Sequence, residues 1–208
     1  MRSALLIGNG LNRCYKNAIP WDKLLERIAN EYHVRFNEKN PFPLEFESIA
    51  NQILNEDNRI AKDIYNEIKL KIAKMVCSQT PEPDSLQRLF TSNDHVDCIL
   101  TTNYDYMLEK AFTGELKPEP SSQDKSETKY SLYRFEEHMG KMFYHIHGEA
   151  NMPNSVCLGY EHYAAYLSKM REYLKAPPEV SAKISGINWS KKHSWVDLFF
   201  THDVYIVG

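Results

Sequence analysis

The segment Ile99-Leu100-Thr101-Thr102-Asn103-Tyr104-Asp105 begins as an apolar run and ends abruptly in polar and aromatic side chains. Two other segments of this 208-residue chain, Leu5-Leu6-Ile7-Gly8-Asn9-Gly10 and Tyr144-His145-Ile146-His147-Gly148, follow the same pattern. A buried parallel strand whose carboxyl end opens into a ligand crevice has this appearance. The three segments therefore predict strands that deliver backbone N–H groups, an amide, a carboxylate and an imidazole to one site.

Helical patterns separate the expected strands. Apolar residues recur at helical spacing in three segments between residues 21 and 78, which we interpret as a helical insertion or cap beside the sheet. We expect core strands at 3–7, 96–100, 141–146 and 204–207, and a short edge strand at 130–135. Further helices are expected at 106–112, 160–173 and 195–200. This alternation predicts an α/β fold, a Rossmann-like doubly wound parallel sheet with a helical module.

Composition limits the number of domains and the class of partner. With 42% hydrophobic residues the chain can bury one sizeable core, so we expect a single domain over 1–208. The net charge of −3 provides no basic excess, so nucleic acid is not indicated as a partner. The short basic run at 191–193 is expected to be a solvated face, the polar stretch at 113–129 a surface loop, and 176–178 a helix break.

Neither the N-terminus nor the cysteines point to an extracellular or metal-binding protein. The first apolar stretch is too short for a signal sequence, and no segment approaches membrane-spanning length, so we expect a cytoplasmic protein without a membrane partner. No two cysteines have the spacing of a metal clip, so no zinc is expected. Cys98, within an expected strand, should behave as a small buried hydrophobe. The four cysteines are Cys14, Cys77, Cys98 and Cys157.

The glycines after the first expected strand suit a phosphate-binding turn. Gly8 and Gly10 permit a tight turn and close approach of backbone N–H groups to a pyrophosphate. Arg13 stands where a full dinucleotide fingerprint would place its third glycine, and a plain tight turn explains the pattern nearly as often. Asn12 and Arg13 are candidate phosphate or ribose contacts, although Arg13 could equally be an exposed charge.

The polar end of the second strand is more specific. Asn103 can both donate and accept hydrogen bonds, so it could hold a ribose hydroxyl or position a water. Asp105 could accept from a ribose hydroxyl or simply cap the next helix.

The third strand ends in a pair of histidines. His145 and His147 lie two residues apart and should point to the same side of a regular strand. No third ligand accompanies them, so a metal site is not indicated, and one of the two could be a structural histidine. His147, at the strand exit, is better placed to accept a proton, because an imidazole titrates near neutral pH. Glu149 either orients a neighbour or faces solvent. Tyr163 and Tyr166 could stack on adenine or line an interface, but their spacing favours packing.

Together these motifs resemble the sirtuin-like NAD-consuming domains, in particular the divergent branch of bacterial anti-phage systems. The resemblance spans nearly the whole chain in order and includes two further segments, Leu158-Gly159-Tyr160-Glu161-His162-Tyr163 and Val204-Tyr205-Ile206-Val207-Gly208. It implies that Asn103 holds the ribose and a water, that Asp105 contacts the ribose, and that His147 is the general base. By the same resemblance the NAD contacts would be Gly8, Asn9, Gly10, Asn12, Arg13, Thr101, Thr102 and Tyr104.

The activity implied by the resemblance is hydrolysis of NAD to nicotinamide and ADP-ribose. Protein-deacylating sirtuins carry a four-cysteine zinc module, which this chain lacks, so a deacylase is the third choice. The second choice is a module that senses NAD or ADP-ribose without hydrolysis. A freely active NAD hydrolase would poison its cell, so we expect control by homo-oligomerisation, a regulatory partner protein or an additional domain. Family members continue beyond the strand that ends at Gly208, so this chain is either a fragment or lacks part of the pocket.

Overall fold

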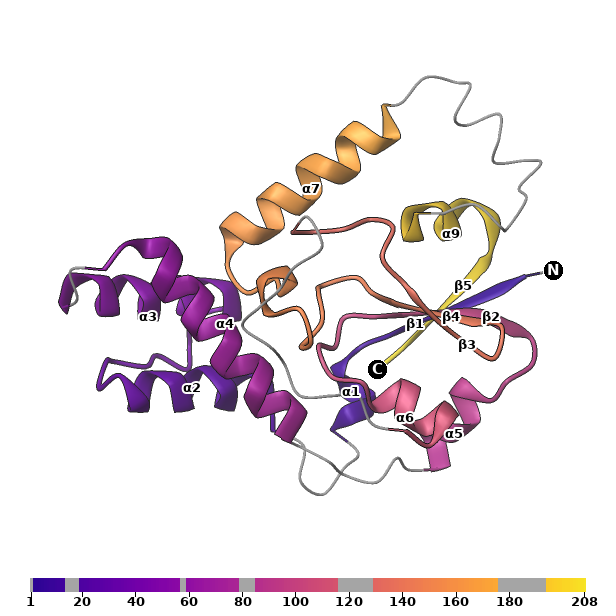
Figure 1. Ribbon diagram of the computed structural model, residues 1–208, viewed down its shortest axis with the longest axis horizontal. Coiled ribbons are helices and arrows are strands. Elements are labelled where there is room, and N and C mark those ends of the chain that lie inside the picture. Colours follow the sequence, from indigo (N-terminus) through magenta and orange to yellow (C-terminus); the bar gives the residue numbers. More distant parts are fainter. Residues whose placement is uncertain (1, 14–18, 57–58, 79–84, 116–128, 176–193) are drawn as a thin grey trace.

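A computed structural model gives the fold of the chain and describes residues 2–13, 19–56, 59–78, 85–115, 129–175 and 194–208. Its centre is a five-stranded sheet in the order β3-β4-β2-β1-β5. Four strands run parallel, and β3 pairs antiparallel with β4 at one edge. Helices cover both faces (Figure 1), so the predicted Rossmann-like α/β fold is confirmed. The strands are β1 (Ser3–Ile7), β2 (Val96–Thr101), β3 (Glu136–His138), β4 (Lys141–His145) and β5 (Asp203–Val207).

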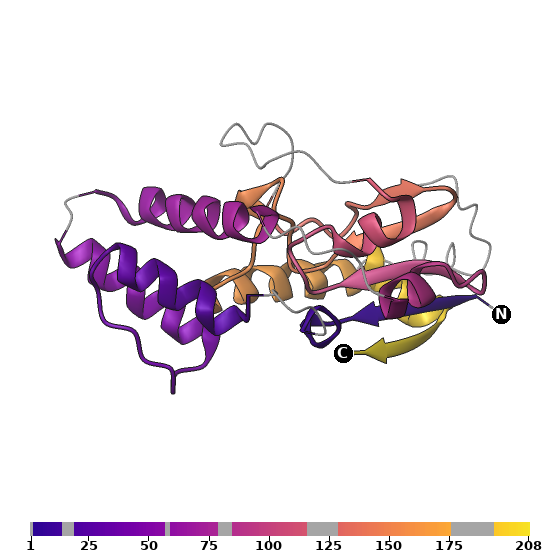
Figure 2. The ribbon, with the colours of Figure 1, turned by 90° about the horizontal axis from the view of Figure 1, so that it is seen from below.

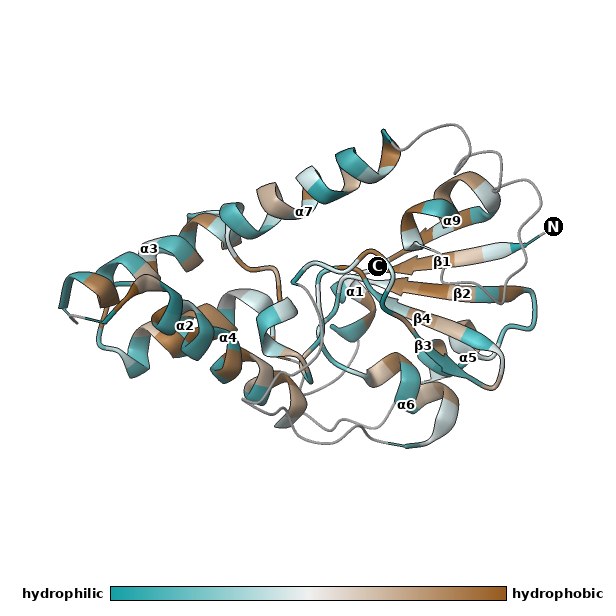
Figure 3. Ribbon diagram, turned by 45° about the horizontal axis from the view of Figure 1, so that its top comes forward, coloured by the Kyte–Doolittle hydropathy of each residue, from teal (hydrophilic) through white to brown (hydrophobic). Residues whose placement is uncertain are grey.

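Successive residues of each central strand pack against different helices. Ile99 lies in one apolar cluster with Leu108, whereas the next residue, Leu100, lies in another with Tyr166. Since side chains alternate across a strand, these clusters occupy opposite faces of the sheet. Figure 3 shows that the central parts of β1 and β2 are hydrophobic, as strands buried on both faces should be. One face is covered by α5 (Ser85–Thr91) and α6 (Met107–Thr113), and the other by α7 (Tyr160–Leu174) and α9 (Trp195–Thr201).

A helical module lies beyond the carboxyl ends of the strands (Figures 1 and 2). All three segments expected to be helical between residues 21 and 78 are helices in the structure. Their apolar stripes close on one another, and Ile28, Ile49 and Ile68 are fully buried between them. The module therefore has its own core next to the edge of the sheet where a ligand crevice is expected. It consists of α2 (Trp21–Glu31), α3 (Phe42–Glu56) and α4 (Ala61–Ser78).

Two expectations about secondary structure need correction. The edge strand predicted at 130–135 is wrong, because the strand next to β4 is Glu136–His138. Tyr130, Leu132 and Phe135 pack into the core under α7 and α9, which explains their apolar character without strand pairing. The short helix α5 was not expected. Helices expected at 106–112, 160–173 and 195–200 match α6, α7 and α9 with small shifts at their ends.

Some expectations fall outside the described residues. These are the helix break at 176–178, the basic run at 191–193, Cys14, and most of the polar stretch at 113–129. Cys98 is fully buried, as expected, and burial raises the pKa of its thiol to about 12. Within the described ranges, no helix is both long and apolar enough to cross a membrane.

Candidate active site

The three motifs meet at one edge of the sheet. Ile7 pairs with Thr101, and Thr101 pairs with His145, so β1, β2 and β4 end side by side. Backbone hydrogen bonds continue beyond the strands: the Thr102 amide donates to the Ile7 carbonyl at 3.2 Å and the Ile146 amide to the Thr101 carbonyl at 2.9 Å. The segments that follow the three strands are therefore held together, as the sequence predicted.

Asn103 presents an unused acceptor at this edge. Its side chain is buried, at 2% exposure, and its Nδ2 donates to the Gly8 carbonyl at 3.4 Å. The backbone N–H of Asn103 donates to Thr101 Oγ1 at 3.1 Å, which holds the backbone in place. The Oδ1 atom is buried and has no hydrogen-bond partner among the described residues. Because a buried polar atom without a partner is costly, this oxygen is suited to accept a hydrogen bond from a ligand or water.

His147 provides a second unused group. Its Nδ1 is buried and has no hydrogen-bond partner within the described part of the chain. The ring of Tyr163 lies edge-on to the imidazole, with 5.3 Å between ring centroids. Burial lowers the pKa of His147 to about 4, so the imidazole is neutral at neutral pH. A neutral imidazole has one accepting nitrogen, so His147 can take a proton from a reacting group.

His145 contacts Glu109 of α6, whereas His147 contacts Tyr163 of α7, and these helices cover opposite faces of the sheet. The expectation that the two histidines point to the same side is therefore wrong. β4 ends at His145, and the Gly148 amide turns back to the His145 carbonyl at 3.1 Å. Gly148 has a φ of 92°, and a Cβ there would lie 2.2 Å from the Ser155 carbonyl oxygen, so only glycine fits this turn. The alternation of a regular strand therefore stops before His147.

The imidazole of His145 is charged and contacts both the backbone of Asn103 and a carboxylate on α6. Nδ1 lies 2.9 Å from the Asn103 carbonyl oxygen and Nε2 lies 2.7 Å from Glu109 Oε1. Both partners only accept hydrogen bonds, so both ring nitrogens must carry protons. Burial acts to lower the pKa of His145, but the nearby Glu109 carboxylate outweighs it and raises the pKa to about 9. His145 is thus an imidazolium that binds α6 to the backbone of Asn103.

Asp105 is tied to α1 (Asn9–Asn12) and to α6. Its Oδ1 accepts from the Met107 amide at 3.0 Å, which is the helix-capping role considered above, and its Oδ2 accepts from Asn12 Nδ2 at 2.7 Å. The Asn12 Oδ1 in turn accepts from Gln87 Nε2 at 3.2 Å. Burial raises the pKa of Asp105. Asn12 is 5% exposed and both ends of its amide are engaged, so its place in the structure is to hold Asp105.

The other predicted NAD contacts after β2 differ in whether their side chains are already hydrogen-bonded within the protein. The Thr101 hydroxyl donates to the Ile7 carbonyl at 3.0 Å, and the Tyr104 hydroxyl donates to the Cys157 carbonyl at 2.6 Å. Both side chains thereby serve the fold. Thr102 is half-buried at the same edge.

The glycine turn packs against the last strand. The Gly8 amide donates to the Val207 carbonyl at 2.9 Å. Gly10 approaches the C-terminal backbone so closely that a Cβ would lie 2.5 Å from the carbonyl carbon of Gly208. This close approach requires a glycine at position 10, whereas a Cβ on Gly8 would lie no closer than 3.9 Å to any neighbouring atom. Asn9 is half-buried and Arg13 exposed beside them.

Other residues near the site differ in how much the sequence revealed of them. Of the two alternatives for Glu149, the structure supports the one in which it orients its neighbours: it is buried, 2.5 Å from Arg134 Nε, and accepts from the Tyr106 hydroxyl at 2.6 Å. Glu109 and Gln87 carried no visible signal, because their roles depend on which helix lies beside which strand end. Tyr166, as its spacing favoured, is a core residue.

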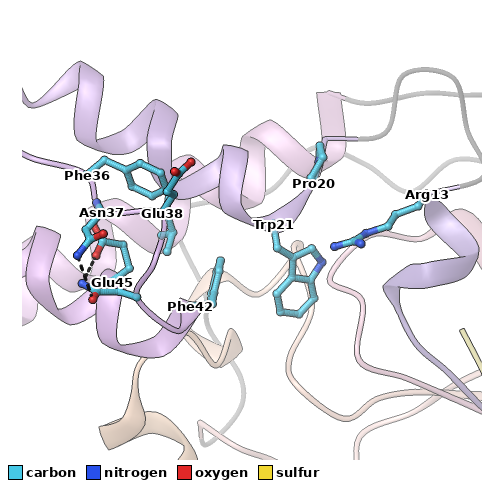
Figure 4. A pocket seen from close by; sticks show the side chains of 10 residues that line it. Arg13, Pro20, Trp21, Phe36, Asn37, Glu38, Phe42 and Glu45 are labelled. Atoms are coloured by element: carbon cyan, nitrogen blue, oxygen red, sulfur yellow. Dashed lines mark hydrogen bonds between the residues drawn. The ribbon is translucent and has the colours of Figure 1, made fainter.

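A cavity of about 670 Å³ lies next to these motifs, on the side of the helical module. Figure 4 shows Arg13 at one end, Trp21 and Phe42 in the middle, and the loop with Glu38 at the other end. Trp21 stacks on Tyr104 with 4.9 Å between ring centroids, so it forms a wall between the cavity and the second motif. The cavity is lined by Arg13, Pro20, Trp21, Leu25, Phe36, Asn37, Glu38, Asn40, Phe42 and Glu45.

Comparison with known proteins finds similarity to one family model and to two curated proteins. Residues 97–182 match the family model of the SIR2-like domain. Over 199 residues the chain is 28% identical to the NAD(+) hydrolase ThsA of Bacillus cereus (strain MSX-D12). The aligned region covers 96% of this chain and 37% of that protein. It is 25% identical over 166 residues to the NAD(+) hydrolase ThsA of Acinetobacter baumannii (strain 532279), covering 78% of this chain and 30% of that protein. The chain thus spans about a third of the length of these curated relatives.

Proposed function

We propose that this chain carries a SIR2-like domain. We further propose that its site hydrolyses the bond between nicotinamide and ribose in NAD. Both relatives named above are NAD(+) hydrolases, which supports this reaction for the similar chain. The observation that carries the proposal is the pair of unsatisfied buried atoms, Asn103 Oδ1 and His147 Nδ1, at the same edge of the sheet. An enzyme that binds a ribose and activates a water needs both kinds of group.

The chemistry follows from the charge on the substrate. The glycosidic bond between ribose C1′ and the nicotinamide nitrogen breaks, and its electron pair neutralises the positively charged ring as the ring leaves. The ribose passes through an oxocarbenium-like transition state, as in glycoside cleavage. Water adds to C1′, and His147 accepts a proton from the water or from a ribose hydroxyl. The products are nicotinamide, ADP-ribose and one proton, which His147 returns to solvent.

Asn103 and Asp105 have separate parts in this mechanism. Asn103 Oδ1 accepts a hydrogen bond from a ribose hydroxyl or from the attacking water, while its Nδ2 remains on the Gly8 carbonyl. Asp105 is held by Asn12 and the Met107 amide, so it faces the ribose from a fixed position. Asn9 and Gly10, at the turn after β1, contact the phosphates. A neutral His147 is essential, because an imidazolium could not accept the proton and would repel the developing positive charge.

Release of nicotinamide from NAD tests this proposal. Asn103→Ala and His147→Ala should each reduce the rate by roughly a hundred- to ten-thousandfold, the range for loss of general-base or positioning groups. Matched controls are Asn51→Ala and His95→Ala, which replace exposed residues on α3 and at the amino end of β2. Wild-type rates in both site variants would refute the assignment. Binding of NAD without hydrolysis by the unmodified chain would favour the sensor alternative.

Control of the activity is the second part of the proposal. Free hydrolysis of NAD would deplete the cofactor pool of the host, so we propose a regulated cytoplasmic effector of anti-phage defence. Regulation would come from a homo-oligomer, a partner protein or an additional domain. The greater length of the curated relatives is consistent with the last of these. Light scattering of the purified chain, with nicotinamide release measured over the same concentrations, tests whether activity follows self-association.

A further inference from the structure

The backbone of Asn103 is held at both its N–H and its carbonyl. The N–H donates to Thr101 Oγ1 at 3.1 Å, and the Thr101 hydroxyl itself donates to the Ile7 carbonyl at 3.0 Å. The carbonyl oxygen of Asn103 lies 2.9 Å from Nδ1 of His145. The side-chain bond from Asn103 Nδ2 to the Gly8 carbonyl is 3.4 Å, longer than is usual for such bonds. The direction of the Asn103 side chain therefore depends mainly on the contacts of its backbone.

The contact with His145 belongs to a closed series of contacts around α6. Nε2 of His145 lies 2.7 Å from Oε1 of Glu109, which is in the first turn of α6. Oδ1 of Asp105 accepts from the Met107 amide at the start of the same helix. Since Asn103 and Asp105 are two residues apart, this short segment is joined to α6 at both of its ends. Both side chains assigned to the ribose are thereby fixed relative to one helix.

Burial makes the arrangement dependent on the protons of the His145 ring. The side chains of His145 and Glu109 are 3% and 2% exposed, so bulk water cannot replace either contact. The ring of Tyr106 lies edge-on to the imidazole, with 5.0 Å between ring centroids. Both contacts need a proton on the ring nitrogen, because a carbonyl and a carboxylate only accept hydrogen bonds. A ring that loses one proton leaves one of its two contacts without a donor.

The electrostatic surroundings of His145 favour the charged ring. Burial acts to lower the pKa of His145, but the Glu109 carboxylate and, to a smaller extent, Glu149 outweigh it and raise the pKa to about 9. Burial raises the pKa of Asp105, and the charge on His145 acts against that rise. The groups that interact with the ring are Glu109 on α6, Glu149 in the turn after β4, and Asp105 and Tyr106 after β2, while Arg134 pairs with Glu149.

We propose that His145 is a positioning residue for NAD hydrolysis, whose doubly protonated ring fixes the backbone of Asn103 so that Oδ1 meets the ribose or the attacking water. The effect on the rate rests on the proposed function, whereas the coupling of His145 to Asn103 requires no substrate. His145 itself does not touch the substrate. Because Asn103 acts at the reacting end of NAD, a disturbance of its position should lower kcat more than it changes KM.

The pH dependence of kcat tests the proposal. At saturating NAD, kcat for nicotinamide release should fall as pH rises through about 9, because one contact of His145 then lacks its donor. At neutral pH, His145→Gln should lower kcat about ten- to a hundredfold and leave KM within about twofold. The alkaline limb should disappear in this variant, because a glutamine side chain has one nitrogen where histidine has two and does not titrate.

Glu109→Gln is the more discriminating variant. It keeps an oxygen that accepts from Nε2 but removes the charge that raises the pKa of His145. The alkaline limb of kcat should therefore move to lower pH by at least about one unit, whereas a role in stability alone would leave it in place. His138→Gln is the matched control, because His138 lies 3.2 Å from Glu136 on the edge strand β3 of the same sheet. This control should leave kcat and its pH dependence unchanged.

Nuclear magnetic resonance separates this inference from the proposed function. Without NAD, the carbonyl-carbon and side-chain amide resonances of Asn103 should titrate together with the His145 ring, and in His145→Gln they should stay constant over that range. If they follow His145 in a chain that releases no nicotinamide, the proposed function fails while the coupling stands. Asn103 resonances insensitive to His145, an alkaline limb that persists in His145→Gln, or one that Glu109→Gln does not move would overturn the inference.

Discussion

His145 and His147 lie two residues apart, at and just beyond the end of one strand, yet their surroundings give them different charge states. His145 is held between the Asn103 carbonyl and Glu109, and its pKa is raised to about 9. His147 is also largely buried, but no charged group opposes the effect of burial, and its pKa is lowered to about 4. Burial alone therefore does not determine the state of a histidine. The partner on the adjacent helix determines it.

The two histidines are therefore suited to different tasks. His145, protonated at neutral pH, cannot accept a proton there, but it can fix the backbone of Asn103 through its Nδ1. A neutral His147 takes no part in the contacts of His145 with Asn103 and Glu109, and it can act as a base. The turn at Gly148 separates the two rings and is the structural cause of the difference.

The largest expected effect is on hydrolysis, through His147. His147→Gln keeps a polar side chain of similar size but no basic nitrogen, so nicotinamide release should fall by roughly a hundred- to ten-thousandfold. The free energy of unfolding should change by less than about 1 kcal/mol, because the ring nitrogen Nδ1 has no partner to lose. Rate assays and urea denaturation of the same preparation measure both. A variant that loses stability and activity in proportion would assign His147 to the fold rather than to catalysis.

Removal of Glu109 should act mainly on stability. Glu109→Ala leaves a buried imidazolium or a neutral ring without its partner, which costs about 3–5 kcal/mol in comparable buried pairs. The double variant His145→Leu with Glu109→Ala should be less destabilised than the sum of the two single variants, because it leaves no buried charge without its partner and only the Asn103 carbonyl loses its donor. Denaturation curves of the three variants complete the cycle. Additive losses would show that the 2.7 Å contact contributes no coupling.

Features of this site that depend on neighbouring residues could be predicted from the sequence, whereas features that depend on contacts between distant segments could not. The strand ends and the three helices of the module were predictable, because an apolar run and a helical stripe are local patterns. The separation of His145 from His147 was not, because it requires knowing that β4 stops at His145. Gln87 and Glu109 were missed because they act across helices that meet only in the folded chain. The misplaced edge strand has the same cause, since Leu132 is apolar because it packs into the core under α7 and α9, not because it belongs to a strand.

Substitution at Gly148 tests the cause of the separation. Gly148→Ala introduces a Cβ 2.2 Å from the Ser155 carbonyl oxygen, at a φ of 92° that side chains disfavour. The strain of the left-handed conformation is about 1–3 kcal/mol, and displacement of the 155–156 backbone adds to it. Activity should fall with stability, because His147 moves relative to Asn103. Gly140→Ala, also at positive φ but with open space around its Cβ position, is the control that measures the conformational cost alone.

The smallest and most specific effect is the pH dependence of stability, where the two histidines should act at opposite ends of the scale. The pKa of His145 is raised above its unfolded value, so its stabilisation is complete below about pH 6.5 and is lost as pH rises through about 9. The pKa of His147 is lowered, so the folded state loses stability as pH falls from about 6.5 toward 4. Relative to the unmodified chain, His145→Leu should flatten the alkaline limb of a plot of unfolding free energy against pH, and His147→Gln the acid limb. Because carboxylates, His162 and His202 titrate on the acid side in every variant, the difference between curves isolates His147. If both variants flattened the same limb, the two rings would share one environment and the division of tasks between them would be wrong.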